Sequence, residues 1–463
     1  MQRPNIIYIH SHDTGRYIQP YGYAVSTPNL QRFAEEGVLF RNAFCAGPTC
    51  SPSRAALLTG MCPHRNGMLG LSHHGGRLRD PSMHLANYLK SHGYATALSG
   101  TTHETGRSNE EIKALGYDRL VAREYWPKWA KTFESWNAYY AQAAADYILK
   151  ADDSRPFFLS CGFDLTHRMG KGEQWHTTLN PPEGDSRYVK PPAPLPDTPE
   201  TRRDFADFSV AVNRLDTCMG RVLDAIATAG IAENTWVFIT TDHGIAFPLM
   251  KCNLTVHGTG VMLMARGPGG FSGRKVVDAL VSHIDIFPTI CELTELPPPE
   301  AIEGVSLVPL VNGAETVRDA VFAEVNWHGV PEPMRTVRTE RYAYIRRYAP
   351  RPKPGSNCDN SISKTLLRSA GWPERTHAPE ELYDLIFDPN EACNRAGDPA
   401  YKTVLSKMRS RLQAWMVDTG DPVLTGRIDP VPGADSKKLD GTSPDEWLPA
   451  EPIIIDTEHV DMG

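Results

Sequence analysis

The first three hundred residues alternate short apolar segments with amphipathic ones, and this alternation restricts the chain to few folds. A chain that alternates strands and helices in this way forms an α/β fold, with a mostly parallel sheet and helices on both faces. The strands are predicted at residues 5–9, 94–98, 156–161 and 236–240, and the helices at residues 28–36, 85–91 and 208–227.

Charged pairs follow two of the predicted strands directly. His12-Asp13 ends the first strand, and Asp242-His243 ends the strand at residues 236–240. Functional side chains of parallel sheets gather at the carboxyl ends of the strands, and carboxylates from two strands can hold a hard divalent ion. Either aspartate alone would more simply cap a turn or a helix. Together they favour a metal site.

Residues 50–60, CSPSRAALLTG, place a cysteine at the start of a predicted helix. The first N–H groups of a helix are unpaired and lie at the positive end of its dipole, so an anionic oxygen or sulfur is favoured there. Arg54 can add a permanent charge with forked donors over the same turn. The segment therefore predicts a site for a negatively charged group.

This segment resembles the signature of the type I sulfatases, in which the cysteine is oxidised to formylglycine. Cys50, Pro52, Ser53, Arg54 and the closing Thr59-Gly60 fall in register. The resemblance implies an alkaline-phosphatase-like fold in which helices sandwich a mostly parallel sheet. Within the family the chain is most similar to the heparan N-sulfatases, or sulfamidases, from about residue 4 to about residue 422. The segments that carry this likeness are 40–44, 66–68, 156–159, 246–248, 333–335 and 381–384.

The resemblance implies a metal held by His12, Asp13, Cys50, Asp242 and His243. His12 stands where the family has an aspartate, and His243 is an accepted variant. Calcium is the expected ion. Manganese and zinc are the alternatives, because two imidazoles make the ligand set softer than an all-oxygen one.

Three further residues, His103, His167 and Lys251, match family positions that bind sulfate. In Gly100-Thr101-Thr102-His103 the histidine of the family's G-K-x-H stretch is present, but Thr101 replaces the lysine. His167 and Lys251 match the family's second histidine and second lysine. A satisfied loop histidine and a solvated lysine are the alternatives for these two residues.

The resemblance also implies a reaction. A hydrated aldehyde at position 50 has two hydroxyls on one carbon: one attacks sulfur, and the other expels sulfate by collapse to the aldehyde. Arg54 is expected to hold this diol, and Lys251, His103 and the metal to hold the sulfate. His103 or His167 then protonates the leaving group.

The expected substrate is a small anionic sulfated amino sugar such as N-sulfoglucosamine. Thr101, His328, Arg335 and the His73-His74 pair are candidates for binding it, each with an equal case for an ordinary packing or surface role. The rival function is that of a phosphonate monoester or phosphodiester hydrolase of the same superfamily. A glycan-binding protein without catalysis is disfavoured, because Cys50 and its predicted partners are intact.

Bulk properties narrow the remaining choices. A net charge of −7 and the lack of a long basic run argue against nucleic acid as a partner, and no apolar run is long enough to span a membrane. No signal-peptide pattern opens the sequence, which favours a cytoplasmic protein, or a periplasmic or secreted one if the sequence was trimmed. Nine scattered cysteines indicate reduced thiols, eight of them packing residues. A formylglycine-generating enzyme is the expected maturation partner, and a homo-oligomer is left open.

Three parts are predicted along the 463 residues. Residues 1–310 form the catalytic domain, and the proline-rich residues 297–300 read as a linker. Residues 311–422 form a smaller α+β subdomain with a strand at 341–347 and a helix at 401–417. Residues 423–463 are expected to form an arm with little structure of its own.

Overall fold

The computed structural model describes residues 3–125, 127–152, 154–169, 174–175, 184–349, 354–437 and 447–455. An eight-stranded sheet in the order β10-β2-β9-β8-β1-β5-β3-β4 forms its centre. All neighbouring strands are parallel except at β9, which is antiparallel to both β2 and β8. The strands are β1 (Asn5–Ser11), β2 (Val38–Phe44), β3 (Ala95–Gly100), β4 (Arg119–Leu120), β5 (Phe157–Gly162), β8 (Thr235–Thr241), β9 (Leu263–Arg266) and β10 (Lys275–Ser282).

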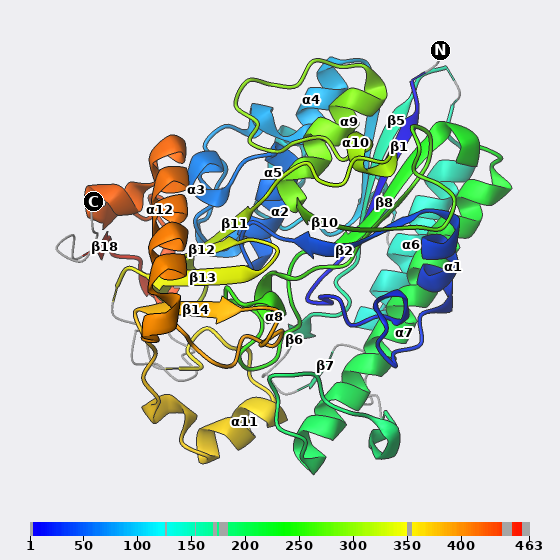
Figure 1. Cartoon of the computed structure of the whole chain (residues 1–463). Coiled ribbons are helices and arrows are strands. Elements are labelled where there is room, and N and C mark those ends of the chain that lie inside the picture. Colours follow the sequence, from blue (N-terminus) through cyan, green and yellow to red (C-terminus); the bar gives the residue numbers. More distant parts are fainter. Residues whose placement is uncertain are drawn as a thin grey trace.

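Helices cover both faces of this sheet, as the sequence predicts (Figure 1). In β1, Ile7 and Ile9 join one buried cluster, whereas Ile6 and Tyr8 join the other. This two-residue period is that of a strand buried on both sides. The first cluster lies under α1 (Pro28–Glu36), α6 (Phe133–Leu149) and α7 (Pro199–Thr228), and the second under α2 (Cys50–Thr59), α4 (Leu85–Ser91), α9 (Ile286–Thr294) and α10 (Val308–Val311).

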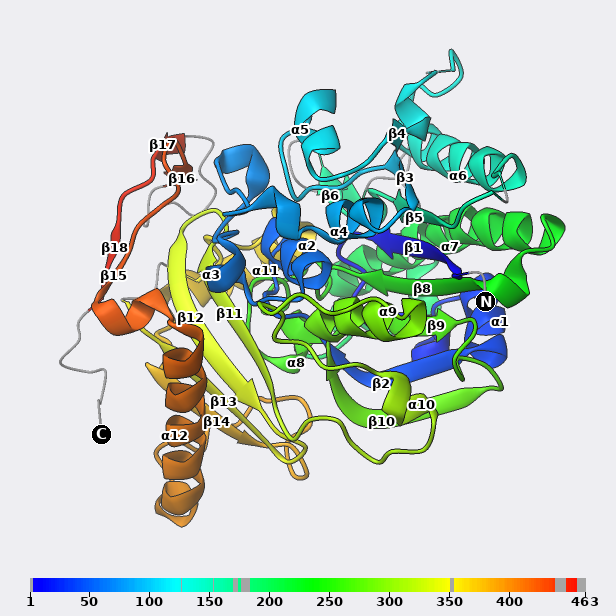
Figure 2. The same ribbon diagram turned by 90° about the horizontal axis from the view of Figure 1, so that it is seen from above.

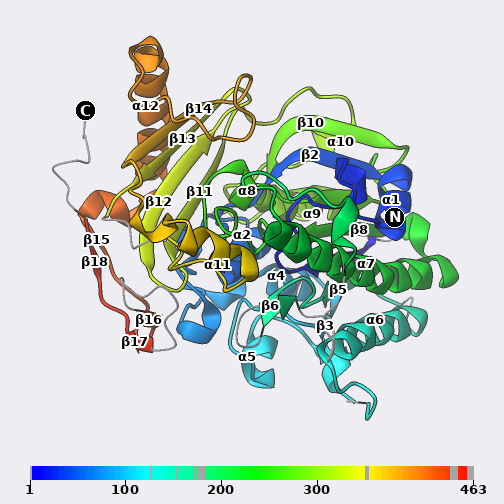
Figure 3. The same cartoon turned by 90° about the horizontal axis from the view of Figure 1, so that it is seen from below.

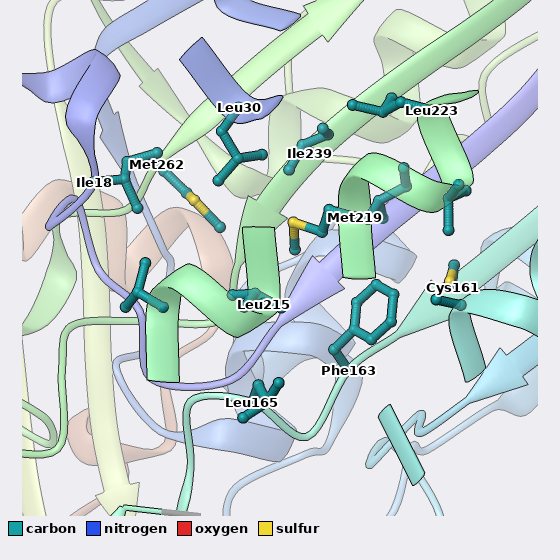
Figure 4. Close-up of a cluster of buried hydrophobic side chains, with 14 of the residues drawn as sticks. Ile18, Leu30, Cys161, Phe163, Leu165, Leu215, Met219, Leu223, Ile239 and Met262 are labelled. Atoms are coloured by element: carbon teal, nitrogen blue, oxygen red, sulfur yellow. The ribbon is translucent and has the colours of Figure 1, made fainter. Parts of the chain in front are cut away.

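Figure 4 shows how the long helix α7 packs on the first face. Leu215, Met219 and Leu223 recur at helical spacing and meet Ile239 of β8 and Phe163 after β5. Such close-packed apolar contacts hold the strand ends in place. The helix begins earlier than predicted, at Pro199, where Thr198 caps it by accepting a hydrogen bond from the Thr201 amide.

A second, four-stranded antiparallel sheet lies beside the first (Figure 2). It comprises β11 (Val321–Trp327), β12 (Pro331–Arg338), β13 (Tyr342–Arg347) and β14 (Glu380–Asp384), and α12 (Lys402–Thr419) packs against it. The smaller C-terminal α+β unit is therefore present. The limits at residues 310 and 422 stay our proposal.

The C-terminal arm differs from the expectation of little structure. Within its described residues, β15 (Arg427–Ile428) pairs with β18 (Ile453–Ile454), and β16 (Asp435–Lys437) pairs with β17 (Trp447–Pro449). Ile428, Ile453 and Ile455 are buried in the cluster beneath α12. These isoleucines anchor the arm, and a count of its Pro, Asp and Gly residues does not reveal them.

All nine cysteines are free thiols, in agreement with the sequence. Cys393 is exposed, so the expectation that every cysteine other than Cys50 packs in the interior is wrong for this residue. None of the helices in the described ranges has the length and apolar character that crossing a membrane would take.

Candidate active site

Four adjacent strands carry the predicted site residues. In the order β8-β1-β5-β3 their carboxyl ends open into loops that hold Asp242 and His243, His12 and Asp13, His167, and Thr101 and His103. The fifth contribution is α2, which begins at Cys50 and lies between the two sheets (Figure 3). Adjacency of the strands explains how residues so distant in sequence meet.

Asp13, Cys50, Asp242 and His243 form a buried set whose ligand atoms lie within 4.8 Å of one another. His243 Nδ1 is 2.9 Å from the Gly244 carbonyl oxygen, which only accepts, so Nδ1 donates and Nε2 is the nitrogen that faces the set. That nitrogen lies 3.3 Å from Asp13 Oδ1 and 3.4 Å from Cys50 Sγ. Asp13 Oδ1 is buried and has no hydrogen-bond partner among the described residues. Such converging acceptors fit a cation.

His12 and His167 adjoin this set. Their ligand nitrogens, with Asp13 and Cys50, also lie within 4.8 Å of one another. His12 Nδ1 is 3.2 Å from Asp242 Oδ2. Burial, reinforced by the charge of Arg54, lowers the pKa of His12 to about 3, so its imidazole is neutral and can offer a lone pair. The five predicted metal residues therefore come together in one place.

Arg54 forms hydrogen bonds with residues of this buried set and of β1. Its Nη2 donates to Asp242 Oδ2 at 2.9 Å and to the Ser11 carbonyl at 2.7 Å, and its Nη1 contacts His10 Nδ1. Burial opposes ionisation of Asp242, but the charges of His243 and Arg54 outweigh it and hold the pKa of Asp242 well below its usual range. Arg54 thus keeps the Asp242 carboxylate charged and in place.

Cys50 is the first residue of α2 and only 1% exposed. Burial raises the pKa of its thiol well above the ordinary value, and the charges of Lys251 and Arg54 do not offset this. The unmodified thiol is therefore not favoured as an anion although it lies at the start of the helix, because burial outweighs the nearby positive charges. An unmodified Cys50 would be a poor nucleophile at neutral pH.

Lys251 contacts Asp13 of the buried set. It also contacts Asp359, a residue that the sequence did not point to. Its Nζ lies 3.1 Å from Asp13 Oδ2 and 3.1 Å from Asp359 Oδ2. Burial alone would lower the pKa of Lys251, but the two carboxylates raise it well above its ordinary value. Asp359 belongs to the C-terminal part of the chain, so both units contribute to the site.

Several of the predicted histidines and Thr101 line a cavity of about 700 Å³. His12, Thr101, His103 and His167 line it, together with His73. His103 Nε2 lies 3.1 Å from His73 Nδ1, and His167 Nδ1 donates to the Arg168 carbonyl oxygen. This volume is in the range of about 300–1,000 Å³ usual for small-molecule sites.

The backbone is strained at two of the strand ends. Asp13 and His103 have φ angles of 49° and 73°, which few residues other than glycine adopt. Strain of this kind persists only where the surroundings enforce it, and it is common at active sites. Both strained residues belong to the site, at the ends of β1 and β3.

Two predicted substrate contacts are placed differently. Arg335 is 0% exposed, and it donates to both carboxylate oxygens of Asp421, at 2.5 and 2.8 Å, inside the small unit. It is a core residue and does not face the cavity, because it points inward from the middle of β12. His328 and His74 line a separate cavity of about 20 Å³.

Comparisons with known proteins agree with this geometry. The family model described as "Sulfatase" matches residues 4–296, and that of the "N-sulphoglucosamine sulphohydrolase, C-terminal" region matches residues 256–353. Human N-sulphoglucosamine sulphohydrolase is 29% identical over 454 residues, which cover 86% of this chain and 87% of the human one.

Solved structures share the fold. A 2-O GAG sulfatase superposes with a TM-score of 0.68 at 23% identity, covering 91% of this chain and 93% of its own. A protein in complex with its substrate D-glucosamine-2-N,6-O-disulfate gives a TM-score of 0.69 at 18% identity, covering 91% and 99%.

The chain belongs to the sulfatase family. It is a hydrolase of sulfate esters or sulfamates on an alkaline-phosphatase-like fold.

Proposed function

We propose that this sulfatase acts on a sulfated amino sugar such as N-sulfoglucosamine, through a formylglycine made from Cys50 and a divalent metal. The observation that carries the proposal is the buried convergence of Asp13, Cys50, Asp242 and His243. The human sulphohydrolase, similar over almost its full length, supports the amino sugar.

A metal would be held by Asp13, Asp242 and His243, with His12 beside them, and would supply charge neutralisation at the sulfuryl oxygens. Calcium stays our first choice because two ligands are carboxylates, and manganese and zinc stay open because of the imidazoles. Asp242 needs no further proton release to bind it, since burial is outweighed by the charges of His243 and Arg54, which hold its pKa well below the usual range.

Each neighbouring residue has a proposed task. Lys251 holds a sulfate oxygen while it remains anchored by Asp359. His103 and His167 face the cavity, where one of them protonates the leaving nitrogen or oxygen. Arg54 holds Asp242, and through it the shape of the metal site.

The raised pKa of Cys50 supports the modification. A thiol that stays protonated does not attack sulfur well, whereas a hydrated aldehyde provides hydroxyl groups at the same place. We therefore expect the protein to be inactive when it is made without a formylglycine-generating enzyme.

The rival proposal, a phosphonate monoester hydrolase, rests on His12 and Thr101, the two departures from the sulfatase pattern. Release of product from N-sulfoglucosamine, glucosamine 6-sulfate and a phosphonate monoester would be measured side by side on protein co-expressed with the maturation enzyme. Preference for the N-sulfate supports the proposal, and preference for the phosphonate overturns it in favour of the rival.

Peptide mass spectrometry of the segment around Cys50 completes the test. The aldehyde is expected in active protein, and Cys50→Ala is expected to abolish turnover. Full activity with an unmodified cysteine would contradict the formylglycine.

A further inference from the structure

The cavity beside His103 has walls that sulfate cleavage alone does not explain. It is built from the loop after β3, from η4 (Val121–Arg123) and from α6, which lie near one another in Figure 2. Besides the histidines it presents two arginines, Arg107 and Arg123, and the aromatic residues Trp136 and Tyr140. None of these four belongs to the metal and nucleophile group.

Arg107 is the cation without a partner. It is exposed, and among the described residues its guanidinium has no hydrogen bond or ion pair. Arg123 fixes the loop that carries it, because its Nη1 donates to the Arg107 carbonyl at 2.7 Å and to Asn109 Oδ1 at 2.9 Å. An unpaired, forked donor on an anchored loop suits a carboxylate or a sulfate.

The cavity is positive as a whole. Among the described residues that line it, Asp164 alone is acidic, and burial raises its pKa although the charges of His167, Arg54 and Arg107 oppose this. Against Arg107 and Arg123, this half-buried carboxyl group leaves the lining with an excess of positive charge.

The aromatic wall indicates the shape of the ligand. Trp136 is fixed by a hydrogen bond from its indole Nε1 to the Ala130 carbonyl at 3.1 Å. Trp136 and Tyr140 are both partly buried and both line the cavity. Aromatic rings held in this way present an apolar surface with a polar rim, which suits the C–H face of a sugar ring.

We propose that this cavity selects saccharides that carry a second anionic group, which Arg107 binds while the sugar lies against Trp136 and Tyr140. The inference rests on the proposed function and deepens it. The second anion is a sulfate on the same sugar or a carboxylate on a neighbouring uronate, and both would pair with a guanidinium fork.

The test compares kcat/KM for N-sulfoglucosamine, its 6-O-sulfated form and N-sulfoglucosamine linked to a uronate. Wild type is expected to prefer one or both doubly anionic substrates by about ten- to a hundredfold, the range of a charged hydrogen bond. Arg107→Ala should bring this ratio towards one, mainly through KM, and Arg107→Lys should retain part of it. The substrate whose kcat/KM falls most in Arg107→Ala carries the anionic group that Arg107 binds.

Lys407→Ala is the matched control, because Lys407 is an exposed cation on α12 outside the cavity lining. It should leave the ratio as in wild type. The proposal is overturned if wild type shows no preference, if Arg107→Ala keeps the full ratio, or if Lys407→Ala lowers the ratio equally.

Binding separates this inference from the proposed function. Calorimetry on the Cys50→Ala protein compares glucosamine N,6-disulfate with N-sulfoglucosamine. Tighter binding of the disulfate that disappears in Cys50→Ala/Arg107→Ala supports the cavity even if no sulfate is released from any substrate. Equal binding of the two sugars rejects it even if turnover is found.

Discussion

The resemblance to the sulfatase signature marks His12 and Thr101 as departures from the family pattern, and their charges compensate. His12 stands in place of an aspartate, so one negative charge is missing. Thr101 stands in place of a lysine, so one positive charge is missing. The burial-lowered pKa of His12 keeps its imidazole neutral, so the two changes leave the net charge of the pocket unaltered. Both residues line the same cavity, where charges interact strongly because little water screens them.

This compensation predicts coupling between the two positions. Thr101→Lys alone adds a cation beside Asp164, and His12→Asp alone adds a carboxylate beside Asp242. Each single change should lower kcat/KM, and the double change should recover part of the loss, with a coupling of about 0.5–3 kcal/mol. A double-mutant cycle of kcat/KM, with sulfate inhibition alongside, measures it. Strictly additive effects would show that the two sites act independently.

Asp242 is the residue on which metal and structure both depend. Asp242→Asn removes the charge that faces Arg54, whose guanidinium is 0% exposed. We expect loss of bound metal and of activity, together with a loss of about 3–5 kcal/mol in the free energy of unfolding, because a buried cation is left uncompensated. Metal analysis and urea unfolding measure the two effects. Asp278→Asn, which breaks an ion pair at 64% exposure, should change neither.

At the scale of elements, β3 and β5 meet closely at their carboxyl ends. Gly100 and Gly162 are partners in the parallel register, and a Cβ on Gly162 would lie 2.0 Å from the Thr101 carbonyl oxygen and 2.5 Å from His10 Cε1. The strand ends can approach only without side chains there. The loops that carry Thr101, His103 and Asp164 depend on this approach.

Gly162→Ala should therefore damage the site through the backbone. The methyl group must push away the Thr101 carbonyl, so we expect a loss of about 1–3 kcal/mol in unfolding free energy and a reduced kcat. Thermal unfolding and turnover would be compared with those of Gly397→Ala, where nothing lies within 4 Å of the added Cβ. Wild-type kcat in Gly162→Ala would show that the loops tolerate the shift.

The elements also show what the sequence could and could not predict. Strand ends at His12-Asp13 and Asp242-His243 were predictable, because an apolar run followed by charged residues marks the edge of a parallel sheet. Asp359 was not, because its role depends on a loop of the small unit reaching Lys251 across the domain boundary. Arg335 was misjudged because a sequence does not show which way a strand residue points.

At the scale of the whole molecule, a buried network joins the two units behind the site. His64, in α3 (Pro63–Asn66) after the signature helix, lies 2.5 Å from Glu324 of β11. Arg335 lies 3.5 Å from the same carboxylate and pairs with Asp421. The network therefore runs from α3, which follows the nucleophile helix in the chain, into the small sheet. Its side chains are buried, so each charge depends on the others.

Arg335→Met tests this connection. It removes the guanidinium that pairs with Asp421 and Glu324 in the interior, which should cost about 3–5 kcal/mol of unfolding free energy. Arg341→Met is the control, because the Arg341–Asp384 pair has a side chain that is 52% exposed and should contribute at most about 1 kcal/mol. Chemical denaturation of both variants measures the difference. Equal losses would mean that the buried network carries no special weight.

The same network predicts a dependence of stability on pH. Burial opposes protonation of His64, but the carboxylates of Glu324 and Asp421 outweigh it and raise the pKa of His64 above 6.5. A folded-state pKa above the unfolded one means that the stabilisation is fully present below pH 6.5. It is lost as the pH rises through the folded pKa, and the loss is about 1.4 kcal/mol for every pH unit that separates the folded pKa from the unfolded one.

His64→Gln cannot titrate at this position and lacks the effect. The unfolding free energy of wild type should therefore fall relative to His64→Gln as the pH rises from below 6.5 into the alkaline range. A difference that stays constant over this range would show that His64 is neutral in the folded protein and that its contact with Glu324 is an ordinary hydrogen bond.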